Sequence, residues 1–95
     1  MAVTGAPIPL EDVLAALSDP VRMRIVRALA EESEGLACGT LNLPVTKSTA
    51  SHHFKVLREA GIIDQEMRGR TRHNTLRRDD LERDYPGLLE LVLRP

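Results

Sequence analysis

The chain has 95 residues, of which 42% are hydrophobic, and its formal net charge is −1 at pH 7. A chain of this size and composition forms one small globular domain and is too apolar to be a disordered segment. Its aromatic residues, Phe54 and Tyr85, are too few for a protein that stacks single-stranded bases on aromatic side chains, and its one cysteine excludes an internal disulfide framework.

The first ten residues are apolar, but Pro7 and Pro9 interrupt them and no basic residue precedes them. They therefore lack the pattern of a signal peptide, and no later run is long enough to span a membrane. We expect residues 1–9 to form a flexible arm, residues 10–95 to form a single domain, and the protein to be cytoplasmic, with no membrane partner.

The charges are strongly segregated along the chain. Residues 1–34 carry three Arg and six acidic residues, a net charge of −3, and residues 79–95 carry two Arg and five acidic residues, again −3. Residues 35–78 carry eight Lys or Arg and three acidic residues, a net charge of +5. A basic patch on an otherwise acidic protein predicts a surface that binds nucleic-acid phosphates.

Two helices are predicted before the basic segment. The first has apolar residues at helical spacing, at Leu10, Val13, Leu14 and Leu17. Asp19 is a suitable N-cap and Pro20 a suitable first residue for the second helix, which we expect to end near Glu32. Its expected buried residues are Val21, Ile25, Ala28 and Leu29.

The next segment predicts a helix-turn-helix. Residues 36–42 leave room for a helix of about two turns, and Pro44 then forces an extended bend. A longer helix is predicted from its cap at Thr46 to Gly61, which stands just past the helix end, where positive φ is favoured. Its apolar face consists of Ala50, His53, Phe54 and Leu57, and we expect His53 to be a structural, hydrogen-bonded residue. The opposite face suits the major groove of DNA and carries Ser48, Ser51, His52 and Lys55.

A β-hairpin is predicted directly after this helix. Residues 62–67 and 71–76 have the composition of strands, and residues 68–70 form a tight turn between them. Such a hairpin is a wing, whose cations would reach phosphates or a narrow minor groove: Arg68, Arg70 and Arg72. The predicted fold class is therefore mainly α with a small β-hairpin, a winged helix-turn-helix with helices flanking a two-stranded wing.

A last helical stretch is predicted after a cap at Asp79 or Asp80, with an interruption at residues 85–87. Five of the six residues from 88 to 93 are aliphatic, which is too many for one solvated helix face. We therefore expect a second copy of the chain to cover this segment and the first helix. The predicted dimer interface consists of Leu10, Leu14, Leu88, Leu89, Val92 and Leu93.

Three segments of the chain resemble the ArsR/SmtB family of winged-helix repressors. They are LSDPVRMRIVRAL (residues 17–29), STASHHFKVLREAGII (48–63) and MRGRTRHNTL (67–76). The resemblance implies a homodimer paired through its first and last helices. It also implies that the dimer binds an inverted-repeat operator and leaves it when an effector binds.

The chain departs from the metal-sensing members of that family. Those members carry a Cys-x-Cys pair before the turn, where this chain has only Cys38, and others use histidines on the last helix, where this chain has none after His73. Zinc sites need about four ligands with nitrogen or sulfur well represented, so we predict no metal and no cofactor. Asn74 stands where relatives often carry an aromatic residue, which we expect to loosen the packing of the wing.

We therefore predict a transcriptional repressor that binds double-stranded DNA sequence-specifically as a homodimer and is not an enzyme. Base edges and nearby phosphates would be contacted by Ser48, Ser51, His52 and Lys55, and the DNA backbone or minor groove by Lys47, Arg68, Arg70 and Arg72. Two alternatives stay open, a winged-helix protein-interaction module and a repressor that senses redox state through Cys38. The sequence does not reveal whether a small-molecule effector binds.

Overall fold

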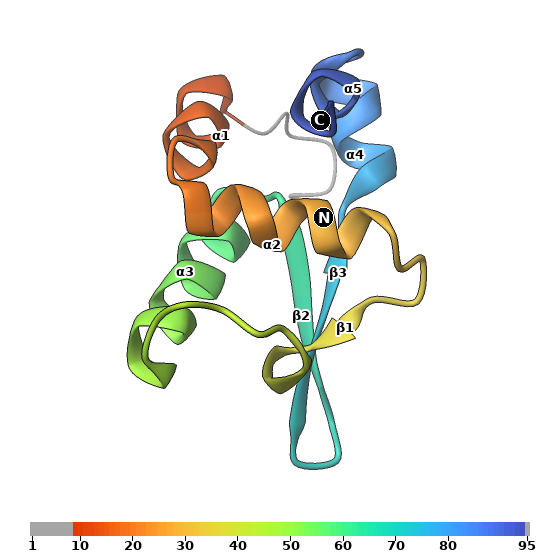
Figure 1. Cartoon of the computed structure of the whole chain (residues 1–95). Coiled ribbons are helices and arrows are strands. Elements are labelled where there is room, and N and C mark those ends of the chain that lie inside the picture. The colour runs from red at the N-terminus through yellow and green to blue at the C-terminus, as the bar shows by residue number, and fades with distance from the viewer. Residues whose placement is uncertain (1–8, 95) are drawn as a thin grey trace.

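The computed structural model describes residues 9–94, which form five helices and a three-stranded antiparallel sheet (Figure 1). The helices are α1 (Leu10–Leu17), α2 (Pro20–Ala30), α3 (Lys47–Glu59), α4 (Arg78–Asp84) and α5 (Leu88–Val92), and a 3₁₀ turn, η1, spans Cys38–Thr40. The strands are β1 (Leu36–Ala37), β2 (Ile63–Arg68) and β3 (Thr71–Leu76). The arm predicted for residues 1–9 lies outside the described residues, apart from Pro9 directly before α1.

Capping interactions confirm the predicted start of α2 and both predicted ends of α3, whereas α2 ends at Ala30, two residues before the predicted Glu32. The Asp19 carboxylate accepts hydrogen bonds from two backbone N–H groups at the start of α2, at 2.8 and 3.2 Å. The bond from the Arg22 N–H, above all, holds the pKa of Asp19 below its usual value, so this cap is lost as the pH falls through that lowered pKa. At α3, the Thr46 hydroxyl accepts from the Thr49 N–H at 3.3 Å, and Gly61 follows the helix with a φ of 79°.

The helix predicted for residues 36–42 is wrong. The chain there forms β1 and η1, and β1 pairs antiparallel with β3, with Leu36 opposite Asn74 and Ala37 opposite His73. The strand order is β1-β3-β2, so β3 is the central strand and the third strand pairs with its middle residues. A segment this short, with Gly39 inside it, has little helical stability of its own, and the open edge of β3 supplies backbone partners instead.

The core contains apolar side chains from all five helices and from β2 and β3. Helix α2 lies at its centre, in contact with α1, α3 and β3. Its buried face differs from the predicted stripe, because Val26 is buried along with Ile25 and Leu29, whereas Val21 and Ala28 are only half-buried.

Two residues predicted for the dimer interface belong to the chain's own core. Leu89 and Val92 are 3% and 7% exposed, because α5 is a short helix whose i and i+3 positions turn inward. The strongly exposed leucine of α5 is instead Leu91, at 62%. The other predicted members remain at the surface, exposed or half-buried: Leu10, Leu14, Leu88 and Leu93.

The predicted cap of the helix after the wing is also wrong. Helix α4 begins at Arg78, so Asp79 and Asp80 lie within its first turn, where their charges favour the helix dipole. The Asp80 carboxylate accepts from Arg77 Nε at 2.9 Å and from Arg83 Nη1 at 3.0 Å. It thus pairs with the residue before α4 and with a residue one turn further along.

Arg22 connects three helices through its guanidinium group. Its Nε donates to the Ala16 carbonyl at 2.6 Å and its Nη2 to the Ala15 carbonyl at 3.4 Å, at the C-terminal end of α1. Its Nη1 lies 3.1 Å from Nδ1 of His53, a buried residue of α3. Because arginine can only donate, His53 accepts through Nδ1, and its predicted structural role is confirmed.

We expect Arg22→Met to lower the free energy of unfolding by about 1–3 kcal/mol, because two helix-end carbonyls and a buried ring nitrogen lose their donor. Arg24→Met, on the exposed side of the same helix, is the matched control and should change stability by no more than about 0.5 kcal/mol. Chemical denaturation of both variants measures the difference. Equal stabilities would show that Arg22 does not hold the three helices together.

Candidate nucleic-acid interface

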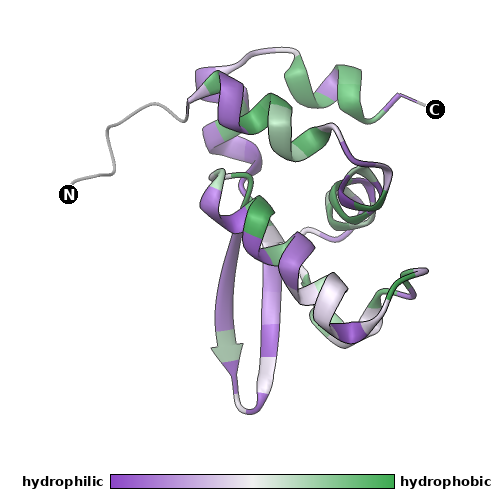
Figure 2. Cartoon of the chain, turned by 90° about the vertical axis from the view of Figure 1, so that its left-hand side faces the viewer, coloured by the Kyte–Doolittle hydropathy of each residue, from purple (hydrophilic) through white to green (hydrophobic). Residues whose placement is uncertain are grey.

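Helix α3 presents the predicted polar arc to the surface. Phe54 and Leu57 are 2% and 0% exposed, and His53 lies beside them, so this side of the helix packs on the core. The residues of the opposite arc are all exposed: Ser48, Ser51, His52 and Lys55. In Figure 2, α3 runs beside the hairpin, and hydrophilic and hydrophobic residues follow one another along its ribbon. The arc contains hydrogen-bonding groups and a cation but no carboxylate.

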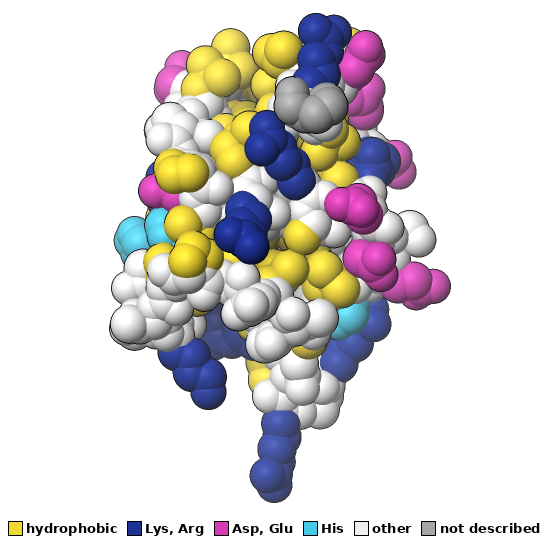
Figure 3. Space-filling model, viewed as in Figure 1, with side chains coloured by type: hydrophobic (Ala, Val, Ile, Leu, Met, Phe, Trp, Pro, Cys, Tyr) yellow, Lys and Arg dark blue, Asp and Glu magenta, His cyan; other side chains and the backbone are white. Residues whose placement is uncertain are grey.

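The wing projects from the helical part of the molecule (Figure 1). Strands β2 and β3 pair from Ile63 opposite Leu76 to Arg68 opposite Thr71. Gly69 has a φ of 66°, which permits the tight turn at the tip. In the space-filling view, Lys and Arg side chains extend from this end of the molecule (Figure 3).

The three predicted wing cations differ in their surroundings. Arg68 forms a 2.8 Å ion pair with Glu66 on the same strand, so part of its charge is neutralised locally. Arg70 and Arg72 are exposed, and within residues 9–94 neither is paired with a carboxylate. These two residues therefore carry the net positive charge of the wing tip.

The sequence interpretation omitted Arg58 from the site. This residue is exposed on the last turn of α3, and its Nη1 donates to the Gln65 side-chain oxygen on β2 at 3.0 Å. It lines a hollow of about 170 Å³ between α3 and the wing, together with Gln65, Glu66, Met67 and Arg72. Its helical spacing, seven residues after Ser51 and three after Lys55, was the signal that could have identified it.

The expectation that Asn74 loosens the wing is wrong. Its side chain is fully buried, and its Nδ2 donates to the Leu36 carbonyl at 3.2 Å and to the Cys38 sulfur at 3.1 Å. Its Oδ1 accepts from the Gln65 amide at 2.6 Å. Cys38 is half-buried, and its redox role stays a prediction.

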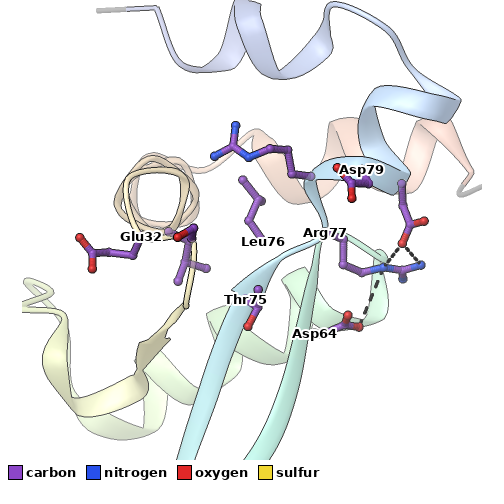
Figure 4. A pocket seen from close by; sticks show the side chains of 10 residues that line it. Glu32, Asp64, Thr75, Leu76, Arg77 and Asp79 are labelled. Carbon is purple, nitrogen blue, oxygen red and sulfur yellow. Dashed lines mark hydrogen bonds and ion pairs between the residues drawn. The ribbon is translucent and has the colours of Figure 1, made fainter.

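A second, mixed-charge hollow lies at the opposite end of the sheet. Its volume is about 470 Å³, and Figure 4 shows Glu32, Asp64, Arg77 and Asp79 around it. Arg77 is already paired with Asp80 at 2.9 Å and lies 3.9 Å from Asp64. The positive charge of this hollow is therefore largely neutralised.

Within residues 9–94, no three His, Cys, Asp or Glu side chains lie close enough together to hold a metal ion. No helix in this range is long and apolar enough to cross a membrane.

Known proteins share this sequence pattern. Residues 17–66 match the model of a helix-turn-helix domain family. The chain is 40% identical over 82 residues to the HTH-type transcriptional regulator YceK of Bacillus subtilis, covering 84% of this chain and 82% of that protein. It is 34% identical over 65 residues to a homologue of the cadmium resistance transcriptional regulatory protein CadC from Staphylococcus aureus, covering 67% of this chain and 54% of that protein.

Solved structures share the fold. An ArsR-like transcriptional regulator from Rhodococcus sp. RHA1 superposes with a TM-score of 0.70 at 25% identity, covering 86% of this chain and 77% of that chain. An ArsR family transcriptional regulator with 20% identity shares the fold alone, with a TM-score of 0.72 over 86% of this chain and 90% of that chain.

The fold and these likenesses define the class of protein as a winged helix-turn-helix transcriptional regulator. The chain belongs to the ArsR/SmtB family, whose members bind DNA and are not enzymes.

Proposed function

We propose that this chain is a homodimeric, cytoplasmic repressor that binds an inverted-repeat operator sequence-specifically. The observation that carries this proposal is the shared exposure of the α3 arc and the wing cations. The arc holds no acidic residue, and the wing tip has a net positive charge. A surface of this kind combines groups that can recognise bases with cations that attract phosphates.

The two parts of the surface would have different roles. An α-helix fits the major groove, where short donors and acceptors and a cation can contact base edges and nearby phosphates: Ser48, Ser51, His52 and Lys55. The backbone or minor groove would be contacted by Lys47, Arg68, Arg70 and Arg72. We add Arg58 to this second group, because it lies between the helix and the wing.

The dimer is supported by apolar side chains on α1 and α5. Leu10 and Leu14 are 42% and 52% exposed, and Leu91 is exposed still further. Figure 3 shows hydrophobic side chains gathered over the end of the molecule where α1 and α5 lie, away from the wing. Pairing of two chains through this face would cover the leucines and leave both α3 arcs free, so that two half-sites about 34 Å apart could be bound together.

Selection from a pool of random duplexes tests the proposal. The wild-type protein should enrich an inverted repeat, and log K against log salt should have a slope of roughly −5 to −7 if each subunit neutralises about three or four phosphates. No enriched sequence and no dependence on salt would contradict DNA binding through this surface and favour the protein-interaction alternative.

Substitutions in α3 and in the wing should have different effects on DNA binding. Ser51→Ala should cost about 1–3 kcal/mol on the selected operator and leave binding to random DNA unchanged, because it removes a base contact. Arg70→Ala should weaken binding to the operator and to random DNA alike and reduce the salt slope by about one, because it removes a phosphate contact. Arg24→Ala, an exposed cation of α2, is the control for lost charge. If Ser51→Ala weakened both DNAs equally, α3 would position the protein and another element would select the sequence.

Leu91→Glu should convert the dimer to a monomer, because it places a charge in the proposed apolar interface while leaving the core residues of α5 intact. Sedimentation velocity measures the change, and operator affinity should fall because two half-sites are no longer bound as a linked pair. Ser33→Glu adds the same charge at an exposed position after α2 and should remain dimeric. A dimeric Leu91→Glu protein would place the interface elsewhere.

A further inference from the structure

Two amide side chains, the buried Asn74 and the half-buried Gln65, form a pair in the middle of the wing. Gln65 and Asn74 are directly opposite each other in β2 and β3, so their side chains lie on the same face of the hairpin. The Gln65 Nε2 donates to the Asn74 Oδ1 at 2.6 Å, and Asn74 has no exposed surface. The pair carries no charge, so the attraction of the wing for DNA phosphates does not require it.

The orientation of both amides is set by their outer partners. The Leu36 carbonyl can only accept, so the Asn74 NH₂ group must face it, and its oxygen must face Gln65. At the other end Arg58 can only donate, so the Gln65 oxygen must face α3 and its NH₂ group must face Asn74. One hydrogen-bonded path therefore leads from the last turn of α3, across both wing strands, to β1.

The backbone at Asn74 is also in close contact with the turn that precedes β1. Gly35 is buried with a φ of 84°, and a Cβ at this residue would collide with the Asn74 carbonyl. The His73 Nε2 lies 2.6 Å from the Glu34 carbonyl in the same turn. Strand β3 is thus fixed on one side by the turn before β1 and on the other by the amide pair.

The tip of the wing extends beyond this fixed point. The pair Arg68–Thr71 lies three residue positions beyond Gln65–Asn74 along the hairpin, which corresponds to about 10 Å of strand. A rotation of 10° at the amide pair would therefore move the tip by about 2 Å. This displacement is large enough to move a side chain at the wing tip out of contact with a DNA groove of a given width.

We propose that Gln65 and Asn74 are positioning residues that hold the wing at a set angle to α3 and thereby select the base sequence at the flanks of each half-site. The inference rests on the proposed function. A wing without this constraint still carries Arg70 and Arg72, so it still attracts phosphates. It adapts to grooves of different width, however, and so discriminates less between flanking sequences.

The test compares three variants with the wild-type protein. Gln65→Leu/Asn74→Leu replaces both amides by apolar groups of similar size, so neither amide is left buried without the other. Gln65→Leu alone keeps Asn74 bonded to β1 and serves if the double variant does not fold. Thr75→Val is the matched control, because it is a neutral apolar replacement on β3 at the position next to Asn74, on the other face of the hairpin.

Each protein is used to select from the same random duplex pool, and base preferences are determined at every position. For the double variant we expect preferences at the positions read by α3 to persist and those at the flanks to disappear, with a loss of about tenfold in operator affinity. The affinity for random duplex should stay within about twofold of the wild-type value, because every cation is retained. For the same reason the salt slope should change by no more than about 0.5. Thr75→Val should match the wild type.

Two results would overturn the inference alone. One is unchanged flank preferences in a folded double variant or, if that variant does not fold, in Gln65→Leu. The other is a uniform loss of preference at all positions, because this is what general destabilisation produces. If the wild-type protein itself selects no sequence, the proposed function fails, and the inference fails with it.

Discussion

The hydrogen bonds of Arg22 fix the helix on which the candidate DNA-binding surface depends. Apolar contacts around Phe54 and Leu57 hold α3 against the core, but such contacts are not directional and permit small rotations. The bond between Arg22 and His53 is directional, and the same guanidinium is anchored to the end of α1. It therefore limits the rotation of α3 about its axis more closely than the apolar contacts alone, and this keeps Ser51 and His52 in a fixed position at the surface.

A second polar contact joins α3 to the wing. Arg58 bonds to Gln65 on the opposite side of the helix from His53, so α3 is held from two directions. The first contact orients the helix in the domain, and the second relates the wing to the helix. Both use an arginine as donor, which remains charged throughout the physiological pH range and offers several N–H groups in one plane.

The charge pattern along the chain becomes a spatial pattern in the fold. The acidic segments contribute α1, α2, all of α4 except Arg78, and α5, and the basic segment contributes β1, α3 and the wing. Figure 3 shows both acidic and basic side chains on the helical part of the molecule, whereas the charged side chains visible at the wing end are Lys and Arg. Such an uneven distribution of charge orients a protein as it approaches a polyanion, because the basic end is attracted more strongly than the rest.

The sequence by itself determined the elements whose signals are local. Asp19 and Pro20 begin α2, Thr46 and Gly61 bound α3, and the wing has its turn at Gly69, because capping and positive φ depend on residues near each other in the chain. The two faces of α3 followed from helical spacing. The family followed from the segments that carry these same elements.

Only the tertiary structure decided the features that join distant segments. The short strand β1 exists because β3 offers it an open edge, and Asn74 is buried because Leu36, Cys38 and Gln65 surround it with partners. Likewise, the composition of α5 shows that its leucines must be covered, but only packing decides that Leu89 faces the core and Leu91 the surface. The physical reason is that burial and hydrogen bonding across the chain depend on where the elements meet, which local sequence does not specify.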